Sequence, residues 1–398
     1  MRVGINAQLL SLSQNYRNGG VSRYISSLVT ELAKKPGKHE YIVFVNGQEV
    51  IQHLEAQVGK QAHMTYVAAP WAESRPATRV AWEQLTLPRL VTQYGIDVLH
   101  APVNVLPERL PRSCATVVTL HDLAFMRYPQ VLTRSKRLYH RTFTVRSLQR
   151  ATLLIAVSES TKQDVHELLH LPAERVQVVY PCIPARFSDV VEEEQVHQLK
   201  EKYNLTDGFL LYLGTIEPRK NISMLIRAYA QLRQTYKIRQ KLVVAGGKGW
   251  MYESIFAQVQ QLGLTSEVFF PGFVSDDEQS VWYHAASVFA YPSLYEGFGF
   301  PVAEALACGT PVVTSNVSSL PEAGAGIAVC VNPNNEDELI EALHRTLTDD
   351  SLRAAFREAS EHVREQFSAQ RMAERTIEAY ERAKEMASSA RQSTIFAH

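Results

Sequence analysis

Short apolar segments alternate with helix-like segments along almost the whole chain, and this alternation limits the fold more than any other feature. The segments are rich in Val and Ile and apolar on both alternating faces, which is typical of strands buried on both sides of a parallel sheet. In the first half they are Arg2–Leu9, Tyr41–Val45, Met64–Val67, Asp97–Ala101, Ala115–Leu120, Leu153–Val157 and Val176–Tyr180. Between them, Val21–Leu32 repeats apolar residues with helical spacing, and Glu159–Leu169 follows a serine-rich helix start. The pattern predicts an α/β fold.

The alternation restarts after a break that contains Pro181, Pro184 and a charged segment at 192–202. The strands expected in the second half are Phe209–Leu213, Lys241–Ala245, Val268–Phe270, Val288–Tyr291, Pro311–Thr314 and Ile327–Val331. Ile222–Leu232 is expected to be a helix, and from Glu336 onward only helices are expected. We therefore predict three parts: an N-terminal domain (1–185), a C-terminal domain (186–375), and a helix with a loose tail (376–398) that packs back on the N-terminal domain. Parallel sheets bind ligands at the carboxyl ends of their strands, so a site is expected in a cleft between the two domains.

Composition excludes several classes of protein. The chain has 398 residues, enough for two or three domains of about 150 residues. Lys and Arg together number 41, as do Asp and Glu, and this balance argues against a dedicated nucleic-acid binder. No apolar stretch is long enough to span a bilayer, and no signal peptide is visible. The cysteines lack zinc-site spacing, which favours a reduced, cytoplasmic setting.

Two glycine clusters are tested as nucleotide motifs. Gly246–Gly249 fails as a P-loop because no glycine stands five residues before Gly247, where the motif requires its first one, so a plain turn between a strand and a helix is the favoured interpretation. Gly297–Gly299 begins like a dinucleotide fingerprint, but Val302 occupies the third glycine position. A Rossmann dehydrogenase is therefore disfavoured.

The second cluster has a different meaning in its full context, residues 292–306. A strand ends at Tyr291, a Gly-rich loop follows, and Pro301 suits the first turn of a helix. Free amides at such a helix start form a diphosphate site. Glu296 and Glu304 then make sense as acceptors for hydroxyls on either side of the phosphates, on a ribose and on a sugar. The alternative for Glu304 is a solvated helix residue, although its neighbours are apolar.

In this setting Glu296-x7-Glu304 resembles the EX7E motif of retaining glycosyltransferases of the GT-B fold, family 4. The resemblance covers nearly the whole chain, because further segments are similar in order and spacing. These segments are 19–24, 119–122, 156–160, 213–221, 271–274 and 307–313. The resemblance implies a GT-B architecture: two Rossmann-like, doubly wound parallel-sheet domains facing an interdomain cleft.

The resemblance also implies roles for residues of the second half. Glu304 would bind the ribose and Glu296 the donor sugar, while Lys220 with Arg219 would neutralise the diphosphate. The amides of Phe298, Gly299 and Phe300 would hold sugar and phosphate, and the backbone at Phe273 and Val274 would contact the base.

From the first half, Gly19 and Gly20 would approach the phosphates, and His121 would contact the donor sugar near the reacting centre. Adjacent residues at a strand end point to opposite sides, which argues against a His121–Asp122 general-base pair. Asp122 is expected either to cap the loop or to contact the acceptor.

The sequence departs from the family at one position. Many members carry an arginine directly after the glycine that ends the first C-domain strand, where this chain has Thr215. The second cation would then come from Arg219 or elsewhere. Preorganised cations and amides can stabilise a departing diphosphate without a metal, and no D-x-D triplet occurs in the sequence. We therefore expect no metal site and no cofactor.

The segment 127–150 is strongly basic and contains no acidic residue. From about Thr133 it is expected to form a basic amphipathic helix, which is typical of a membrane-surface or polyanion site. Arg134, Arg137 and Arg141 are candidate acceptor residues that would meet anionic lipid or the diphosphate of a lipid-linked glycan. The alternative is a solvated helix face.

These observations predict a metal-independent, retaining glycosyltransferase that moves a sugar from a nucleotide donor to a glycan or lipid-linked glycan in polysaccharide biosynthesis. The segment Gly214–Asn221 resembles that of mannosyltransferases, so GDP-mannose is the first expected donor. The expected location is cytoplasmic, with peripheral contact to the inner face of the membrane. The alternatives are a nucleotide-sugar epimerase of the same fold, whose resemblance lacks this motif context, and a non-catalytic nucleotide- or glycan-binding subunit of a biosynthetic complex.

Overall fold

The computed structural model describes residues 1–12, 20–69, 76–128, 140–189, 191–250 and 252–395. It divides into two compact units. Unit 1 comprises Met1–Cys182 together with Ser368–His398, and unit 2 comprises Ile183–Phe367. Every strand expected from the alternating pattern is present, with ends shifted by one or two residues at most. The α/β prediction is confirmed.

Unit 1 contains a parallel sheet of seven strands in the order β3-β2-β1-β4-β5-β6-β7. The strands are β1 (Arg2–Ala7), β2 (Glu40–Val45), β3 (Met64–Ala68), β4 (Val98–Ala101), β5 (Ala115–Leu120), β6 (Leu153–Ala156) and β7 (Val176–Val178). Alternate residues of a strand pack into separate cores on the two faces of the sheet. Val43 packs on the face covered by α1 and α17, whereas Phe44 packs against Trp82 on the other. Burial of both faces explains why the strands read as continuous apolar runs.

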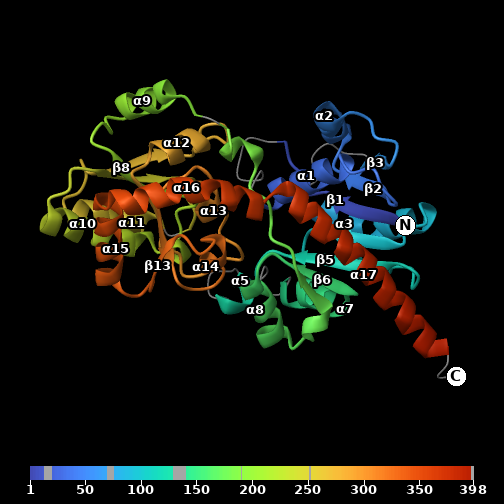
Figure 1. Ribbon diagram of the computed structural model, residues 1–398. Helices are drawn as coiled ribbons and strands as arrows, with labels where there is room; N and C mark the ends of the chain where they lie inside the picture. The colour runs from blue at the N-terminus through green and yellow to red at the C-terminus, as the bar shows by residue number, and fades with distance from the viewer. Residues whose placement is uncertain (13–19, 70–75, 129–139, 190, 251, 396–398) are drawn as a thin grey trace. The chain divides into compact units, whose positions relative to one another are not determined.

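The helices of unit 1 include one from the far end of the chain. The helical segments are α1 (Gly20–Ala33), α2 (Gln48–Val58), α3 (Pro76–Leu85), α4 (Leu87–Gln93), α5 (Ala124–Arg127), the π-helix His140–Thr144, α7 (Val145–Arg150), α8 (Glu159–Leu169), the 3-10 turn Ala173–Arg175 and α17 (Ala369–Ile395). In Figure 1, α17 runs along β5 and β6, and it also packs against α1 and β4. The tail that was expected to be loose is helical as far as Ile395. The helix continues without a Gly or Pro to stop it, and Arg391 donates to the Ser113 carbonyl at 2.5 Å.

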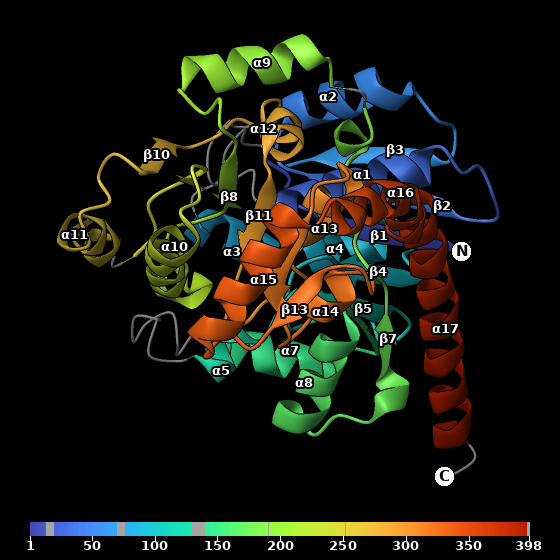
Figure 2. The ribbon, with the colours of Figure 1, turned by 60° about the vertical axis from the view of Figure 1, so that its left-hand side comes forward.

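Unit 2 contains a parallel sheet of six strands in the order β10-β9-β8-β11-β12-β13. The strands are β8 (Phe209–Leu213), β9 (Lys241–Ala245), β10 (Val268–Gly272), β11 (Val288–Tyr291), β12 (Val312–Ser315) and β13 (Val329–Val331). The helices are α9 (Glu193–Lys202), α10 (Ile222–Tyr236), α11 (Glu253–Gln261), α12 (Gln279–Ala285), α13 (Phe300–Ala307), α14 (Leu320–Ala323), α15 (Glu336–Thr348) and α16 (Asp350–Gln366), with 3-10 turns at Ala185–Phe187 and Pro218–Lys220. Figure 2 shows α10 beside α15.

The Gly246–Gly249 cluster is a turn between β9 and α11, which confirms the interpretation as a strand-to-helix turn. Gly246 has φ +136°, and a Cβ atom there would clash with the carbonyl oxygen of Gly214. The turn also binds the loop after β8, because the Ile216 N–H donates to the Gly247 carbonyl at 2.9 Å. Its structural role is therefore to fix the loop that leads to Lys220.

Among the residues that the structure describes, no helix has both the length and the apolarity needed to cross a bilayer.

Candidate active site

The main cluster of predicted residues lies where the strand order of unit 2 reverses. β8 and β11 are neighbours in the sheet, although β9 and β10 lie between them in the sequence. In such sheets the loops after these two strands diverge and leave a ligand site at their carboxyl ends. The loop after β8 carries Arg219 and Lys220, and the loop after β11 carries Ser293 and Glu296.

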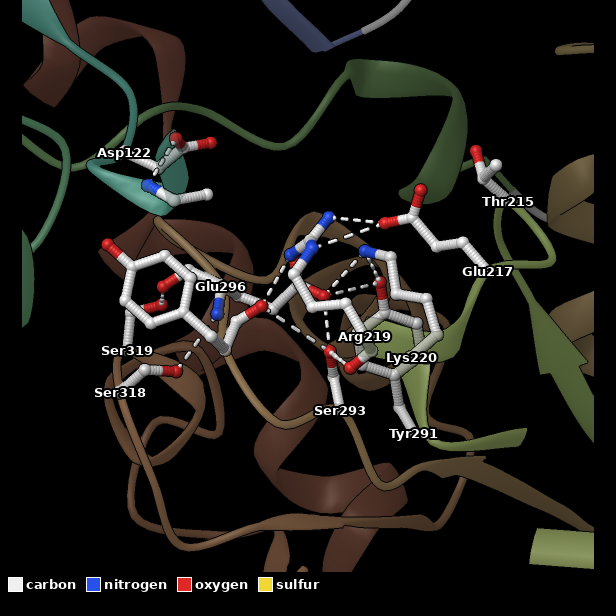
Figure 3. Close-up of polar contacts among 12 residues, drawn as sticks. Asp122, Thr215, Glu217, Arg219, Lys220, Tyr291, Ser293, Glu296, Ser318 and Ser319 are labelled. Carbon is white, nitrogen blue, oxygen red and sulfur yellow. Dashed lines mark hydrogen bonds and ion pairs between the residues drawn. The ribbon is translucent and has the colours of Figure 1, made fainter. Parts of the chain in front are cut away.

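Glu296 is the centre of this cluster. Its Oε1 atom accepts from Lys220 Nζ at 2.5 Å, from Ser293 Oγ at 2.7 Å and from the Tyr291 hydroxyl at 3.1 Å. Lys220 Nζ also donates to the Tyr291 hydroxyl at 2.8 Å. Figure 3 shows these side chains converging on the carboxylate. The structure thus brings together Lys220 and Glu296, which the resemblance assigned to the diphosphate and the sugar.

Arg219 contacts the other oxygen of the same carboxylate, Oε2. Its Nη1 atom lies 3.2 Å from Glu296 Oε2 and donates to the Tyr295 carbonyl at 2.5 Å. Glu217 holds the guanidinium through Nη2 at 2.8 Å and Nε at 3.2 Å. The sequence analysis missed Glu217. Its position two residues before Arg219, within the family segment 213–221, was a usable signal.

Charge and burial oppose each other in this cluster. Burial disfavours the charged form of Glu296, but the positive charges of Lys220 and Arg219 and the hydrogen bonds it accepts lower its pKa to about 2. Burial lowers the pKa of Lys220, while the charge of Glu296 acts in the opposite direction. Glu296 is therefore a carboxylate at neutral pH, able to accept hydrogen bonds from hydroxyls and unable to act as an acid.

The Gly-rich loop leads into α13 as predicted. Gly299 precedes the helix with φ +99°, and a Cβ atom there would lie 2.9 Å from Leu320 Cδ2, so glycine is needed. Phe300 and Pro301 open the helix, while Phe298 is buried against the Phe367 ring.

Glu304 lies inside α13 and is only 1% exposed, which rules out the solvated alternative. The Tyr283 hydroxyl donates to its Oε2 atom at 3.2 Å. Contact between Glu304 and a ribose stays a prediction.

The loop after β10 begins at Gly272, which has φ +84°. Phe273 is 59% exposed and Val274 is 3% exposed. Contact between their backbone and a nucleotide base stays a prediction.

In unit 1, His121 follows the last residue of β5. Its Nε2 atom lies 2.8 Å from the Pro102 carbonyl, so this nitrogen carries the proton. Burial lowers the pKa of His121. Asp122 Oδ1 accepts from the Ala124 N–H at 3.0 Å, which is the capping role; its acceptor role stays a prediction.

Other predicted residues are less fully placed. Gly20 is the first residue of α1, and Gly19 lies outside the described residues. Arg134 and Arg137 also lie outside them, and Arg141 belongs to the π-helix His140–Thr144.

The described arginines of the basic segment are paired with acids from elsewhere in unit 1. Arg127 binds Asp164 at 2.5 Å and Glu167 at 2.5 Å, while Arg146 and Arg150 bind Glu108 at 3.3 and 2.8 Å. The count of charges within 127–150 therefore overestimated the local positive charge, because folding supplies these carboxylates.

Within the part of the chain that the structure describes, no group of three or more His, Cys, Asp or Glu side chains is arranged to hold a metal. Metal independence stays a prediction.

Comparison with known proteins decides the family. Residues 18–187 match the family described as Glycosyltransferase Family 4, and residues 193–363 match Glycosyl transferases group 1. The chain is 33% identical over 367 residues to O-antigen chain mannosyltransferase B of Escherichia coli, covering 91% of this chain and 95% of that protein. The chain belongs to glycosyltransferase family 4.

This glycosyltransferase has further relatives. It is 34% identical over 218 residues to the serotype-specific mannosyltransferase WbdA of Escherichia coli, a match that covers 54% of this chain and 26% of that protein. Its fold is similar to that of Anabaena HepE in complex with UDP and glucose, with a TM-score of 0.68, 18% identity and coverage of 95% and 98% of the two chains. WaaG, a glycosyltransferase involved in lipopolysaccharide biosynthesis, is similar with a TM-score of 0.67, 20% identity and coverage of 95% and 99%. The GT-B fold is thereby confirmed, with a Rossmann-like parallel sheet in each unit.

Proposed function

We propose that this glycosyltransferase transfers mannose from GDP-mannose to a growing glycan, with retention of anomeric configuration and without a metal. Two comparisons support mannose: the full-length relative and the partial relative are both named mannosyltransferases. The acceptor is a glycan or a lipid-linked glycan of polysaccharide biosynthesis. One relative, from Campylobacter jejuni, is named for an acceptor on diphospho-undecaprenol.

The observation that carries the proposal is the Lys220–Glu296–Arg219 cluster at the switch point of unit 2. Glycosyl transfer builds negative charge on the departing diphosphate, and preorganised cations stabilise it most when water is excluded. Lys220 is 8% exposed and is held in place by Tyr291 and Glu296 before any donor binds. With Arg219 and the N-terminus of α13, it can accept the diphosphate without reorganising.

Glu296 has a second task in this proposal. Its Oε1 atom already accepts from three donors, whereas Oε2 carries the longer contact to Arg219. A carboxylate oxygen has two lone pairs, so Oε2 can accept from a hydroxyl of the donor sugar. Glu296 would thus link the position of the sugar to the position of the cations that receive the leaving group.

The experiment is a transfer assay with GDP-mannose, UDP-glucose and UDP-galactose in the presence of EDTA, using short mannosides as acceptors. We expect turnover with GDP-mannose and an α-linked product by NMR, because the donor is the α-anomer. GDP should also raise the melting temperature more than UDP or ADP. These results would establish the donor, retention and metal independence separately.

Each part of the proposal fails on a different outcome. Preference for a UDP-sugar would replace the donor, a β-linked product would exclude retention, and activity restored only by Mg²⁺ or Mn²⁺ would exclude metal independence. Nucleotide binding without turnover of any donor would favour a non-catalytic subunit, the alternative considered from the sequence.

We also propose that the basic segment 127–150 brings the enzyme to an anionic membrane surface, where a lipid-linked acceptor would be found. The protein should co-sediment with vesicles of phosphatidylglycerol and phosphatidylcholine at low salt, and be released at high salt. Replacing Arg134, Arg137 and Arg141 by Gln should abolish sedimentation, whereas Arg150→Gln should have little effect because Arg150 is paired with Glu108. Equal recovery with pure phosphatidylcholine vesicles would show that the segment is a solvated face.

A further inference from the structure

A row of hydrogen-bonded polar side chains is buried within the core of unit 1. His100 on β4 is fully buried, with its Nδ1 atom 2.7 Å from the Tyr380 hydroxyl of α17 and its Nε2 atom 2.8 Å from Thr119 Oγ1 of β5. Thr119 Oγ1 also lies 3.2 Å from the Tyr24 hydroxyl of α1. These side chains lie among the apolar residues that α1 and α17 pack against the sheet.

The chemistry of the His100 ring limits which partners donate and which accept in this row of hydrogen bonds. Burial lowers the pKa of His100 to about 3, so its ring is neutral and has one N–H and one lone pair. One of its two hydroxyl partners must therefore donate and the other must accept. Burying such groups costs free energy unless every one is satisfied, and a satisfied network fixes its members in one arrangement.

This row of hydrogen bonds ends at Tyr24, which packs on His121, the residue that is expected to meet the donor sugar. Thr119 lies in β5 and His121 is the first residue after it, a two-residue spacing that in extended backbone places side chains on the same side. Tyr24 contacts both: its hydroxyl meets Thr119, and its ring packs edge-to-face on the His121 imidazole with centroids 5.1 Å apart. The imidazole is thus held between this ring and the Pro102 carbonyl.

We propose that Tyr380, His100, Thr119 and Tyr24 are positioning residues for the transfer reaction: a hydrogen-bonded relay from the C-terminal helix fixes Tyr24, and the Tyr24 ring sets the orientation of His121. This inference rests on the proposed function, in which His121 contacts the donor sugar. It assigns to α17 a role in catalysis although α17 contributes no residue to the site described above.

Three variants and one control test the relay. Thr119→Val removes the central hydroxyl, Thr119→Ser keeps it, and Tyr380→Phe breaks the far end. Tyr41→Phe is the control, since Tyr41 is 2% exposed in the same core and its hydroxyl takes part in none of the three hydrogen bonds of the relay. We expect Thr119→Val and Tyr380→Phe to lower kcat about 10-fold or more with an unchanged KM for donor, because small displacements of a contact group are costly. Thr119→Ser and Tyr41→Phe should retain the activity of the unmodified protein.

A second readout does not depend on turnover. The ¹⁵N resonances of the His121 ring should shift in Thr119→Val and Tyr380→Phe but not in Tyr41→Phe. If both variants lower the melting temperature yet leave kcat and the His121 resonances unchanged, the relay only stabilises the fold and the proposal is overturned. If the unmodified protein transfers no sugar, the proposed function fails, and the resonances still decide whether the relay orients His121.

Discussion

Replacing Lys220 by Met should lower kcat for sugar transfer by about 10²–10³-fold, the usual effect of removing one preorganised group from a developing negative charge. Lys220 Nζ is the buried cation of the cluster and already donates to Glu296 and Tyr291. The loss should fall mainly on kcat, because charge on the leaving diphosphate grows in the transition state. Initial rates at saturating donor, measured well below the melting temperature, would show it.

The same substitution should also destabilise unit 2, because it leaves Glu296 buried with one cation fewer. Removing one partner of a buried pair typically costs about 3–5 kcal/mol. Lys202→Met on α9 is the matched control, since Lys202 is exposed and outside the cluster. If Lys220→Met kept more than about a tenth of kcat, stabilisation of the leaving group would have to come from elsewhere.

Replacing Glu296 by Gln should produce a stability difference that depends on pH. The pKa of Glu296 is lowered from 4.5 to about 2 despite its burial, because Lys220 and Arg219 favour its charge. A lowered pKa stabilises the folded state above the ordinary value, and this contribution is lost as pH falls from about 4.5 towards 2. Urea unfolding should therefore show Glu296→Gln less stable at pH 7 by about 3 kcal/mol, with the gap closing below pH 4.5.

The same substitution should also affect activity. Glu296→Gln should lower kcat at pH 7 by about 10²-fold, since a neutral amide neither holds Lys220 nor accepts equally from a sugar hydroxyl. Glu193→Gln, an exposed acid on α9, should change neither property. A gap that stays constant from pH 7 to pH 3 would contradict a depressed pKa.

The strands were predictable from sequence because parallel sheets leave a strong local signal. Segments such as Phe209–Leu213 and Ala115–Leu120 are apolar on both faces, and the structure places them with the expected bounds. Lys220 and Glu296 could be brought together only through the family motif, because 76 residues separate them and the strand order must be known first.

Partners distant in the sequence account for what was missed. The segment 127–150 has no acid of its own, yet Glu108 and Asp164 fold against its arginines. Nor does any local pattern connect His100 with Tyr380, which are 280 residues apart. The local sequence around a histidine in a strand or a tyrosine in a long helix does not indicate its hydrogen-bond partner, so tertiary structure is needed to recognise the relay.

Unit 1 is assembled from two segments that are far apart in the sequence, and this has a consequence for synthesis. Proteins emerge from the ribosome N-terminus first, and domains generally fold as units. Unit 1 receives α17, with Tyr380 at 0% exposure in its core, only after residues 369–395 have been made. Unit 2 is continuous in sequence, so it is the first to have all its strands and helices available while the N-terminal unit still waits for its final helix. A chain interrupted between Phe367 and Tyr380 would therefore contain all of unit 2, with the cluster around Glu296, beside an N-terminal unit whose core lacks Tyr380.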